Sequence, residues 1–159
     1  MKSLKELRRV VIGLRPPALD ELGLEHALRQ SLEELKSDGL ICKFYEEGNH
    51  TRLSSSVEIA VYRLVQEALT NIRKHANATK VNLRLRFQKD RLIVEIHDNG
   101  KGFDLSQTLN SAISVGHMGL LGMKQRARML GGDIKIKTGA GAGTTLTLSL
   151  PIQIQEEEV

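Results

Sequence analysis

Four polar side chains in the middle of the chain recur at the spacing of one helix face. They stand at positions i, i+4, i+7 and i+8 and are Glu67, Asn71, Lys74 and His75. A carboxylate can orient or deprotonate a nucleophile, an amide oxygen can bind a hard divalent cation, and ammonium and imidazole groups can donate to phosphate oxygens. The pattern therefore indicates a site for a magnesium-bound polyphosphate, and its alternative is an ordinary solvated helix face.

A second group of residues surrounds a single carboxylate. Residues 98–102 read Asp-Asn-Gly-Lys-Gly. The ionised side chain of Asp98 can only accept hydrogen bonds, so it can accept one from the exocyclic amine of adenine, whereas guanine presents a carbonyl at that edge. Gly100 and Gly102 carry no Cβ and would let the backbone pass close to a base. If Asp98 stood alone, a tight turn after a strand would be the favoured interpretation.

The first group of side chains needs a helix whose opposite face packs on the rest of the domain. Ser55 followed by Glu58 forms the pattern of a capping box, which predicts a helix from about residue 56 to residue 75 or 76. Two further helices are predicted, one from residue 20 or 21 to about residue 38 and one from about residue 120 to residue 130. The apolar face of the central helix consists of Leu64, Val65, Ala68, Leu69 and Ile72.

Alternation of apolar and polar residues predicts the strands. The turn signal Lys89-Asp90 makes a hairpin of the second and third strands, and Asp98 would lie where the third strand ends. The glycine-rich stretch 139–143 should turn the chain between the last two strands. The five predicted strands span residues 40–46, 81–87, 92–96, 134–137 and 144–150.

Composition restricts the class of protein. A chain of 159 residues that is 40% hydrophobic can bury the core of one domain. Lys and Arg number 23 against 19 Asp and Glu, a surplus that suits a phosphate-bearing ligand or an acidic partner. Three Phe, two Tyr and no Trp argue against nucleic-acid binding. The single Cys42 excludes a disulfide framework within one chain and indicates a reducing, cytoplasmic location. No apolar run approaches the length of a membrane span, so we expect no membrane contact by this segment, while a larger parent protein could be membrane-anchored.

Three segments do not belong to the predicted elements. Residues 103–118 show no clear period, and so long a connection is typically functional, so we expect a lid. Residues 2–14 have apolar residues at helical spacing, ended by Arg15-Pro16-Pro17, and indicate the end of a longer helix. Residues 153–159 indicate a frayed tail.

The order of these groups resembles the GHKL ATPase superfamily. After the helix with Glu67 and Asn71 and the hairpin that ends at Asp98 come Gly-His-Met-Gly-Leu-Leu-Gly at 116–122 and Gly-Ala-Gly-Thr-Thr at 141–145. The resemblance covers about residues 55–150. It implies an α/β two-layer sandwich, in which a mixed, mostly antiparallel sheet packs on helices, and it implies ATP and Mg²⁺ as cofactors.

Three motifs are similar to those of one branch of the superfamily. They are Asn-x-x-Lys-His at 71–75, Gly-Leu-Leu-Gly-Met at 119–123 and Leu-Arg-Pro-Pro-Ala-Leu-Asp-Glu-Leu-Gly-Leu at 14–24. They resemble sensor histidine kinases that work with LuxR/NarL-type response regulators. This resemblance implies transfer of the γ-phosphoryl group of ATP to a histidine on a dimerisation domain, and from there to the regulator.

The resemblance also implies a role for each motif residue. Glu67 would be the catalytic residue that orients or deprotonates the nucleophile, and Asn71 would bind both ATP and Mg²⁺. Asp98 would read adenine, and the hydroxyl of Thr144 would support Asp98 or a nearby water. The other ATP-binding residues that it implies are Lys74, His75, Gly100, Gly102, Gly116, His117, Gly119, Leu120 and Gly122.

None of the five histidines matches the phosphoacceptor of these kinases. We therefore expect residues 1–16 to be the end of a dimerisation helix, residues 17–152 to be the ATP-binding domain and residues 153–159 to be a tail. Such a chain should be monomeric and should not autophosphorylate alone, while its parent would be a homodimer. Alternatives are a stand-alone nucleotide-gated protein-binding module, an anti-sigma-factor-type kinase and an ATP-hydrolysing clamp similar to gyrase.

Overall fold

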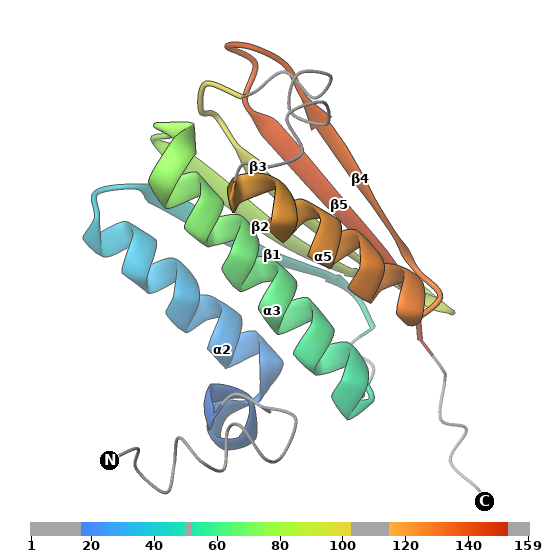
Figure 1. The fold of residues 1–159 in the computed structure, drawn as a ribbon. Coiled ribbons are helices and arrows are strands. Elements are labelled where there is room, and N and C mark those ends of the chain that lie inside the picture. The colour runs from blue at the N-terminus through green and yellow to red at the C-terminus, as the bar shows by residue number, and fades with distance from the viewer. Residues whose placement is uncertain (1–16, 50–51, 103–114, 153–159) are drawn as a thin grey trace, which may run out of the picture.

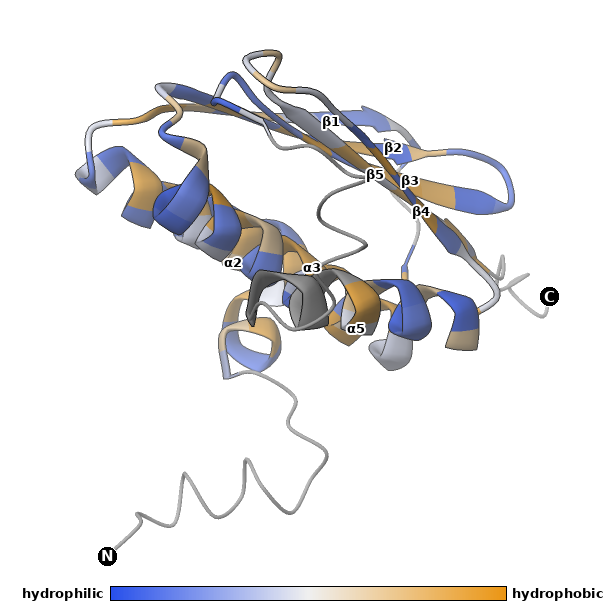
Figure 2. Ribbon diagram, turned by 45° about the horizontal axis from the view of Figure 1, so that its top comes forward, coloured by the Kyte–Doolittle hydropathy of each residue, from blue (hydrophilic) through white to orange (hydrophobic). Residues whose placement is uncertain are grey.

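The computed structural model describes residues 17–49, 52–102 and 115–152, and these form two layers (Figure 1). One layer is a five-stranded sheet, and the other consists of helices that lie side by side on one face of it (Figure 2). The predicted α/β sandwich with a mixed, mostly antiparallel sheet is confirmed. None of the helices in the described part of the chain is long and apolar enough to cross a membrane.

The sheet contains all five predicted strands. Their spatial order is β1-β2-β3-β5-β4. The first pair, β1 and β2, is parallel, and the other three neighbouring pairs are antiparallel. A parallel pair needs a long crossover, which the central helix provides. The strands are β1 (Ile41–Gly48), β2 (Lys80–Phe87), β3 (Arg91–Asp98), β4 (Asp133–Thr138) and β5 (Thr144–Pro151).

Three helices and one π-helical turn make up the second layer within the described residues. The central helix is followed directly by the π-helical turn, so the two together cover the length predicted for a single helix. The elements are α2 (Pro17–Ser37), α3 (Ser55–Asn71), the turn η1 (Ile72–Ala76) and α5 (Val115–Met129).

Two predicted helix starts were wrong. The helix expected from residue 20 or 21 begins at Pro17, because proline is well suited to a first helical turn, where its missing N–H is not needed. The backbone of this helix is interrupted at Gly23, whose φ is 77°. The helix expected from about residue 120 begins at Val115, so residues 115–118 of the predicted lid are helical. A glycine within a helix costs only about 1 kcal/mol, so Gly116 and Gly119 do not prevent the helix from starting earlier than predicted. Residues 103–114 of the lid lie outside the described residues, as do segments 1–16 and 153–159.

The cap of α3 also differs from the prediction. Ser54, not Ser55, is the N-cap residue, with an extended backbone and a side chain that accepts a hydrogen bond from the N–H of Val57 at 3.3 Å. Val57 therefore occupies the position that Glu58 would need to complete a capping box. Of the three consecutive serines at 54–56, local sequence does not decide which one becomes the N-cap residue.

The hydrophobic core lies between the sheet and the helices. In β3 the side chains of Leu92, Val94 and Ile96 alternate toward the helices and are at most 2% exposed. Burying side chains of this size stabilises the fold by about 1.5–3 kcal/mol each, so the alternation fixes which face is covered. Asp98 takes the next position of the same alternation and therefore faces the helix layer.

The loop after β3 packs closely on the end of η1. A Cβ added at Gly100 would lie 2.3 Å from the carbonyl oxygen of Ala76 and 2.8 Å from its Cβ. The N–H of Lys101 donates to the same carbonyl oxygen at 2.8 Å. The absence of a side chain at position 100 therefore lets the strand end and the helix end meet.

We expect Gly100→Ala to lower the free energy of unfolding by about 1–3 kcal/mol, because the added methyl must push the Ala76 carbonyl away. Urea unfolding monitored by circular dichroism measures this change. Gly139→Ala is the matched control, since its Cβ would meet nothing closer than 3.8 Å, and a change within about 0.5 kcal/mol is expected. Equal losses in both variants would show that the contact with Ala76 does not matter.

Candidate functional site

Three segments that are distant in sequence meet at one end of the sandwich. They are the end of η1, the loop after β3 and the turn between β4 and β5 (Figure 1). The backbone of Lys101 joins them, because its N–H donates to Ala76 O and its carbonyl accepts from the N–H of Gly141. At Gly102, where φ is 64°, a Cβ would lie 2.1 Å from Gly139 O, so here too the close approach requires glycine.

Asp98 is the buried acidic side chain of this region. It ends β3 and is only 3% exposed. Its Oδ1 accepts a hydrogen bond from the N–H of Gly100 at 2.8 Å. Among the described residues no cation forms an ion pair with it. A carboxylate buried with so little compensation is costly for stability and is typical of functional sites.

The environment of Asp98 favours its protonated form. Burial raises the pKa of the carboxyl above its ordinary value, because the charged form loses hydration. The hydrogen bond from Gly100 and the charge of His97 act on this pKa in the opposite direction and are smaller effects. A ligand that donates a hydrogen bond to the carboxylate would therefore gain a strong acceptor that water does not reach freely.

Thr144 lies beside Asp98 on the neighbouring strand. The two residues are direct register partners of β5 and β3, and side chains at such positions share a face of the sheet. The hydroxyl of Thr144 lies 2.9 Å from the hydroxyl of Thr138, and Thr138 Oγ1 donates to Gly143 O at 3.2 Å. Thr144 is thus close to Asp98 in the fold. Its hydroxyl contacts that of Thr138, the last residue of β4, next to the Gly139–Gly143 turn.

The central helix brings its polar residues toward the same end. Glu67 and Asn71 are half-buried and lie one turn apart in α3, as predicted. Lys74 and His75 are exposed and lie in the π-helical turn. A π-helix has more residues per turn than an α-helix. Lys74 and His75 are therefore rotated about the helix axis from the positions that an uninterrupted α-helix would give them.

Several predicted residues lie in the first part of α5. They are Gly116, His117, Gly119, Leu120 and Gly122. The N-terminal end of this helix is directed toward the end of the sandwich that carries Asp98 (Figure 1). The first N–H groups of a helix have no partners within it and suit an anion. A Cβ at Gly122 would meet nothing within 4 Å, so packing within the described protein does not require glycine there.

Asn99 is a residue of this region that sequence reasoning assigned no role. Its Oδ1 accepts from the N–H groups of Thr79 and Lys80, both at 2.9 Å. Its Nδ2 donates to Thr79 Oγ1 at 2.8 Å. The residue type was the sequence signal for this role, because asparagine side chains in turns commonly form hydrogen bonds with nearby backbone groups. The partners, about 20 positions earlier in the chain, could not be read from the sequence.

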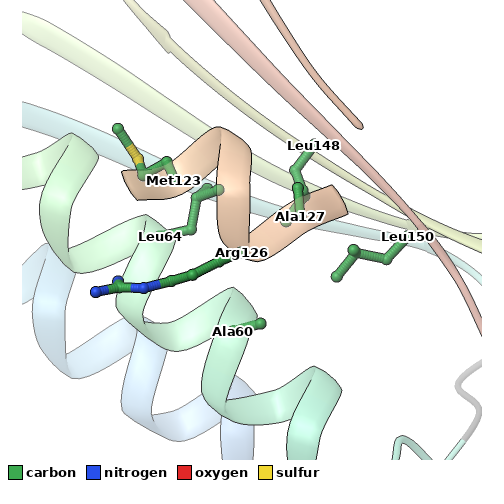
Figure 3. Close-up of a pocket in the computed structure, with 7 residues that line it drawn as sticks. All are labelled: Ala60, Leu64, Met123, Arg126, Ala127, Leu148 and Leu150. Atoms are coloured by element: carbon green, nitrogen blue, oxygen red, sulfur yellow. The ribbon is translucent and has the colours of Figure 1, made fainter. Parts of the chain in front are cut away.

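A separate hollow lies between the helices and β5 (Figure 3). It is lined by Ala60 and Leu64 of α3, by Met123, Arg126 and Ala127 of α5, and by Leu148 and Leu150 of β5. Leu150 pairs with Leu92, whereas Thr144 pairs with Asp98, so the hollow lies toward the opposite end of the sheet. Its mostly apolar lining makes it a gap in the core packing and not a polyphosphate site.

The described residues contain no group of three or more His, Cys, Asp and Glu side chains able to hold a metal ion. Magnesium does not need such a group, because it often keeps several waters and takes one or two protein oxygen ligands together with phosphate oxygens. The amide oxygen of Asn71 is a hard ligand of that type.

Comparison with known proteins gives histidine kinases as relatives. The chain is 43% identical over 137 residues to the signal transduction histidine-protein kinase/phosphatase DegS of Brevibacillus brevis, covering 86% of this chain and 34% of that protein. It is 38% identical over 137 residues to an uncharacterized sensor-like histidine kinase of Chloroflexus aurantiacus, covering 84% of this chain and 23% of that protein. The chain thus spans about a third or less of these relatives.

Solved structures share the fold. The histidine kinase domain of the blue-light activated histidine kinase EL346 from Erythrobacter litoralis superposes with a TM-score of 0.60 at 21% identity, covering 81% of this chain and 64% of that one. The Acinetobacter baumannii histidine kinase AdeS gives 0.64 at 15% identity, with 82% and 63% covered. A sequence model described as "Histidine kinase-, DNA gyrase B-, and HSP90-like ATPase" matches residues 56–154. The match includes the end of α3, Asp98 and the glycine turns that the fold brings together, and the chain belongs to this family of ATPases.

Proposed function

We propose that this chain is the Mg-ATP-binding catalytic domain of a sensor histidine kinase. The observation that carries the proposal is the buried carboxylate of Asp98, held at the end of β3 beside the end of η1 in a chain of this ATPase family. The exocyclic amine of adenine would donate a hydrogen bond to this carboxylate. The cost of burying an unpaired charge is then offset when the nucleotide binds.

The polyphosphate would extend from Asp98 toward the central helix and α5. Asn71 would bind magnesium, and Lys74 and His75 would donate to phosphate oxygens. The backbone N–H groups at the start of α5, around Gly116 and Gly119, would add further donors. Magnesium would neutralise charge on the phosphates as the γ-phosphoryl group leaves. Glu67 would orient or deprotonate the attacking histidine.

The acceptor of the phosphoryl group would be a histidine on a dimerisation domain of the parent protein. Residues 17–152 would form the ATP-binding domain, with the end of a dimerisation helix in 1–16 and a tail in 153–159. The parent would act in the cytoplasm as a homodimer and pass the phosphoryl group to a LuxR/NarL-type response regulator. The Brevibacillus relative is named as a histidine-protein kinase/phosphatase, which supports the kinase assignment.

Nucleotide binding tests the proposal directly. We expect calorimetric titration to give Mg-ATP an affinity roughly 10- to 150-fold above that of Mg-GTP, which corresponds to one charge-assisted hydrogen bond made or misdirected. Asp98→Asn should lower the Mg-ATP affinity at least about tenfold. The exposed carboxylate variant Asp133→Asn should bind as wild type does. Equal binding of ATP and GTP, or no binding by the folded wild type, would contradict the assignment.

Asp98→Asn should be more stable than the wild type at neutral pH. The folded protein holds a proton on Asp98 more tightly than the unfolded chain does, because burial raises this pKa. The free energy of unfolding therefore falls as pH rises through the window between the ordinary and the raised carboxyl pKa. We expect Asp98→Asn to melt above the wild type at pH 7, with the difference shrinking as the pH approaches 4. Thermal melts across this range measure it, and a variant less stable at every pH would refute the burial argument.

The magnesium role of Asn71 has its own signature. Asn71→Ala should lower the affinity for Mg-ATP about tenfold or more, an effect of about 1.4 kcal/mol or more, and should leave the affinity for ATP in EDTA unchanged. Thr70→Ala, at the exposed neighbouring position, is the control and should alter neither. If Asn71→Ala weakens ATP equally with and without magnesium, Asn71 contacts the nucleotide and not the metal.

A further inference from the structure

We propose that Asn99 is a positioning residue that fixes the spacing between the adenine-reading carboxylate and the phosphate-facing end of the central helix. The inference rests on the proposed function. It concerns a side chain that would contact neither the nucleotide nor the metal. The relevant contacts all lie within the described residues, between the loop after β3 and the segment that leads from η1 into β2.

The amide of Asn99 extends the β2–β3 ladder beyond its last regular pair. In the ladder, Val81 is the partner of Asp98, and the N–H of Asn99 still donates to Lys80 O, at 3.3 Å. Beyond this point the Asn99 side chain makes the hydrogen bonds to the β2 side. Its Oδ1 accepts from Thr79 and Lys80, both at 2.9 Å, and its Nδ2 donates to Thr79 Oγ1 at 2.8 Å.

These contacts lie where the chain changes direction sharply. The helix end passes into β2 through Asn77, which is left-handed with a φ of 51°. Asparagine adopts this conformation more readily than other non-glycine residues and commonly ends a helix in it. The Asn99 clasp, meaning the three side-chain hydrogen bonds to Thr79 and Lys80, holds this connection from the strand side.

The clasp joins the two halves of the proposed site. Asn99 directly follows Asp98, and Thr79 follows Ala76, the last residue of η1, by three positions. Within the described residues, the loop and the helix end are also joined by the hydrogen bond from the N–H of Lys101 to Ala76 O. Without the clasp, η1 with Lys74 and His75 could shift relative to Asp98, although neither half would lose its own side chains.

A ligand that spans both halves should therefore depend on Asn99 more than a ligand that fills one half. Mg-ATP would contact both Asp98 and the helix end, whereas adenosine would contact Asp98 and lacks the phosphates that reach the helix end. A purely structural role would lower the melting temperature and leave both affinities unchanged, provided that the measurement is made well below unfolding. A role confined to the Asp98 loop would weaken both ligands equally.

The test is calorimetric titration of Mg-ATP and of adenosine into the wild type and Asn99→Ala, at a temperature at which melts show both to be folded. We expect Asn99→Ala to weaken Mg-ATP about tenfold or more and adenosine by less than about threefold. Thr79→Val, which removes only the hydroxyl partner and keeps both backbone N–H contacts, should bind Mg-ATP within about threefold of the wild type. Should Asn99→Ala not fold, Asn99→Ser carries the same test, because its side chain is too short to reach both N–H groups.

Thr145→Val is the matched control. It removes the hydrogen bond of 2.8 Å between Thr145 Oγ1 and His97 Nδ1, which lies near the same end of β3 but on the face of the sheet opposite Asp98. It should change neither affinity. Equal weakening of Mg-ATP and adenosine by Asn99→Ala, or no weakening of either, overturns the inference while the proposed function stands. Failure of the folded wild type to bind either ligand overturns the proposed function and this inference together.

Discussion

The burial of the Asp98 carboxylate at the last position of β3 is the constraint on which the functional end of this protein depends. The charge is removed from water with one backbone hydrogen bond as its described compensation, so the rest of the fold must supply the free energy that holds it there. The preceding residues Leu92, Val94 and Ile96 do so, because a slip of one position would expose all three to solvent. The hydrophobic pattern of β3 therefore fixes the face of the sheet on which the Asp98 side chain lies.

The same constraint explains the glycines and the backbone contacts around the site. The loop after β3 must approach both the end of η1 and the β4–β5 turn. A Cβ at Gly100 would collide with the carbonyl oxygen of Ala76, and a Cβ at Gly102 would collide with that of Gly139. Lys101 then donates to one segment and accepts from the other. Satisfied backbone groups thus connect three segments without using any side chain that a ligand would need. The geometry of this region is therefore set largely by the main chain.

Sequence reasoning was reliable where the signal is periodic and weak where it depends on a single boundary residue. The five strands and the central helix follow from apolar spacing that the core enforces. The starts of α2 and α5 and the cap of α3 were misplaced, because proline, glycine and adjacent serines each fit more than one position near a helix end. The π-helical turn η1 also had no local signal. It ends at Ala76, which contacts the loop that carries Gly100, far later in the chain.

The sequence by itself determined the fold class, the family resemblance and the identity of the polar residues, because hydrophobic alternation and motif order are properties of the chain read in one dimension. Only the tertiary structure decided that Asp98 is buried, that Lys74 and His75 lie in a widened turn, and that Asn99 clasps Thr79 and Lys80. Each of these depends on segments that are distant in sequence and become neighbours when the sheet and the helices pack. Their physical origin is long-range close packing and hydrogen-bond satisfaction, which no local pattern of residues encodes.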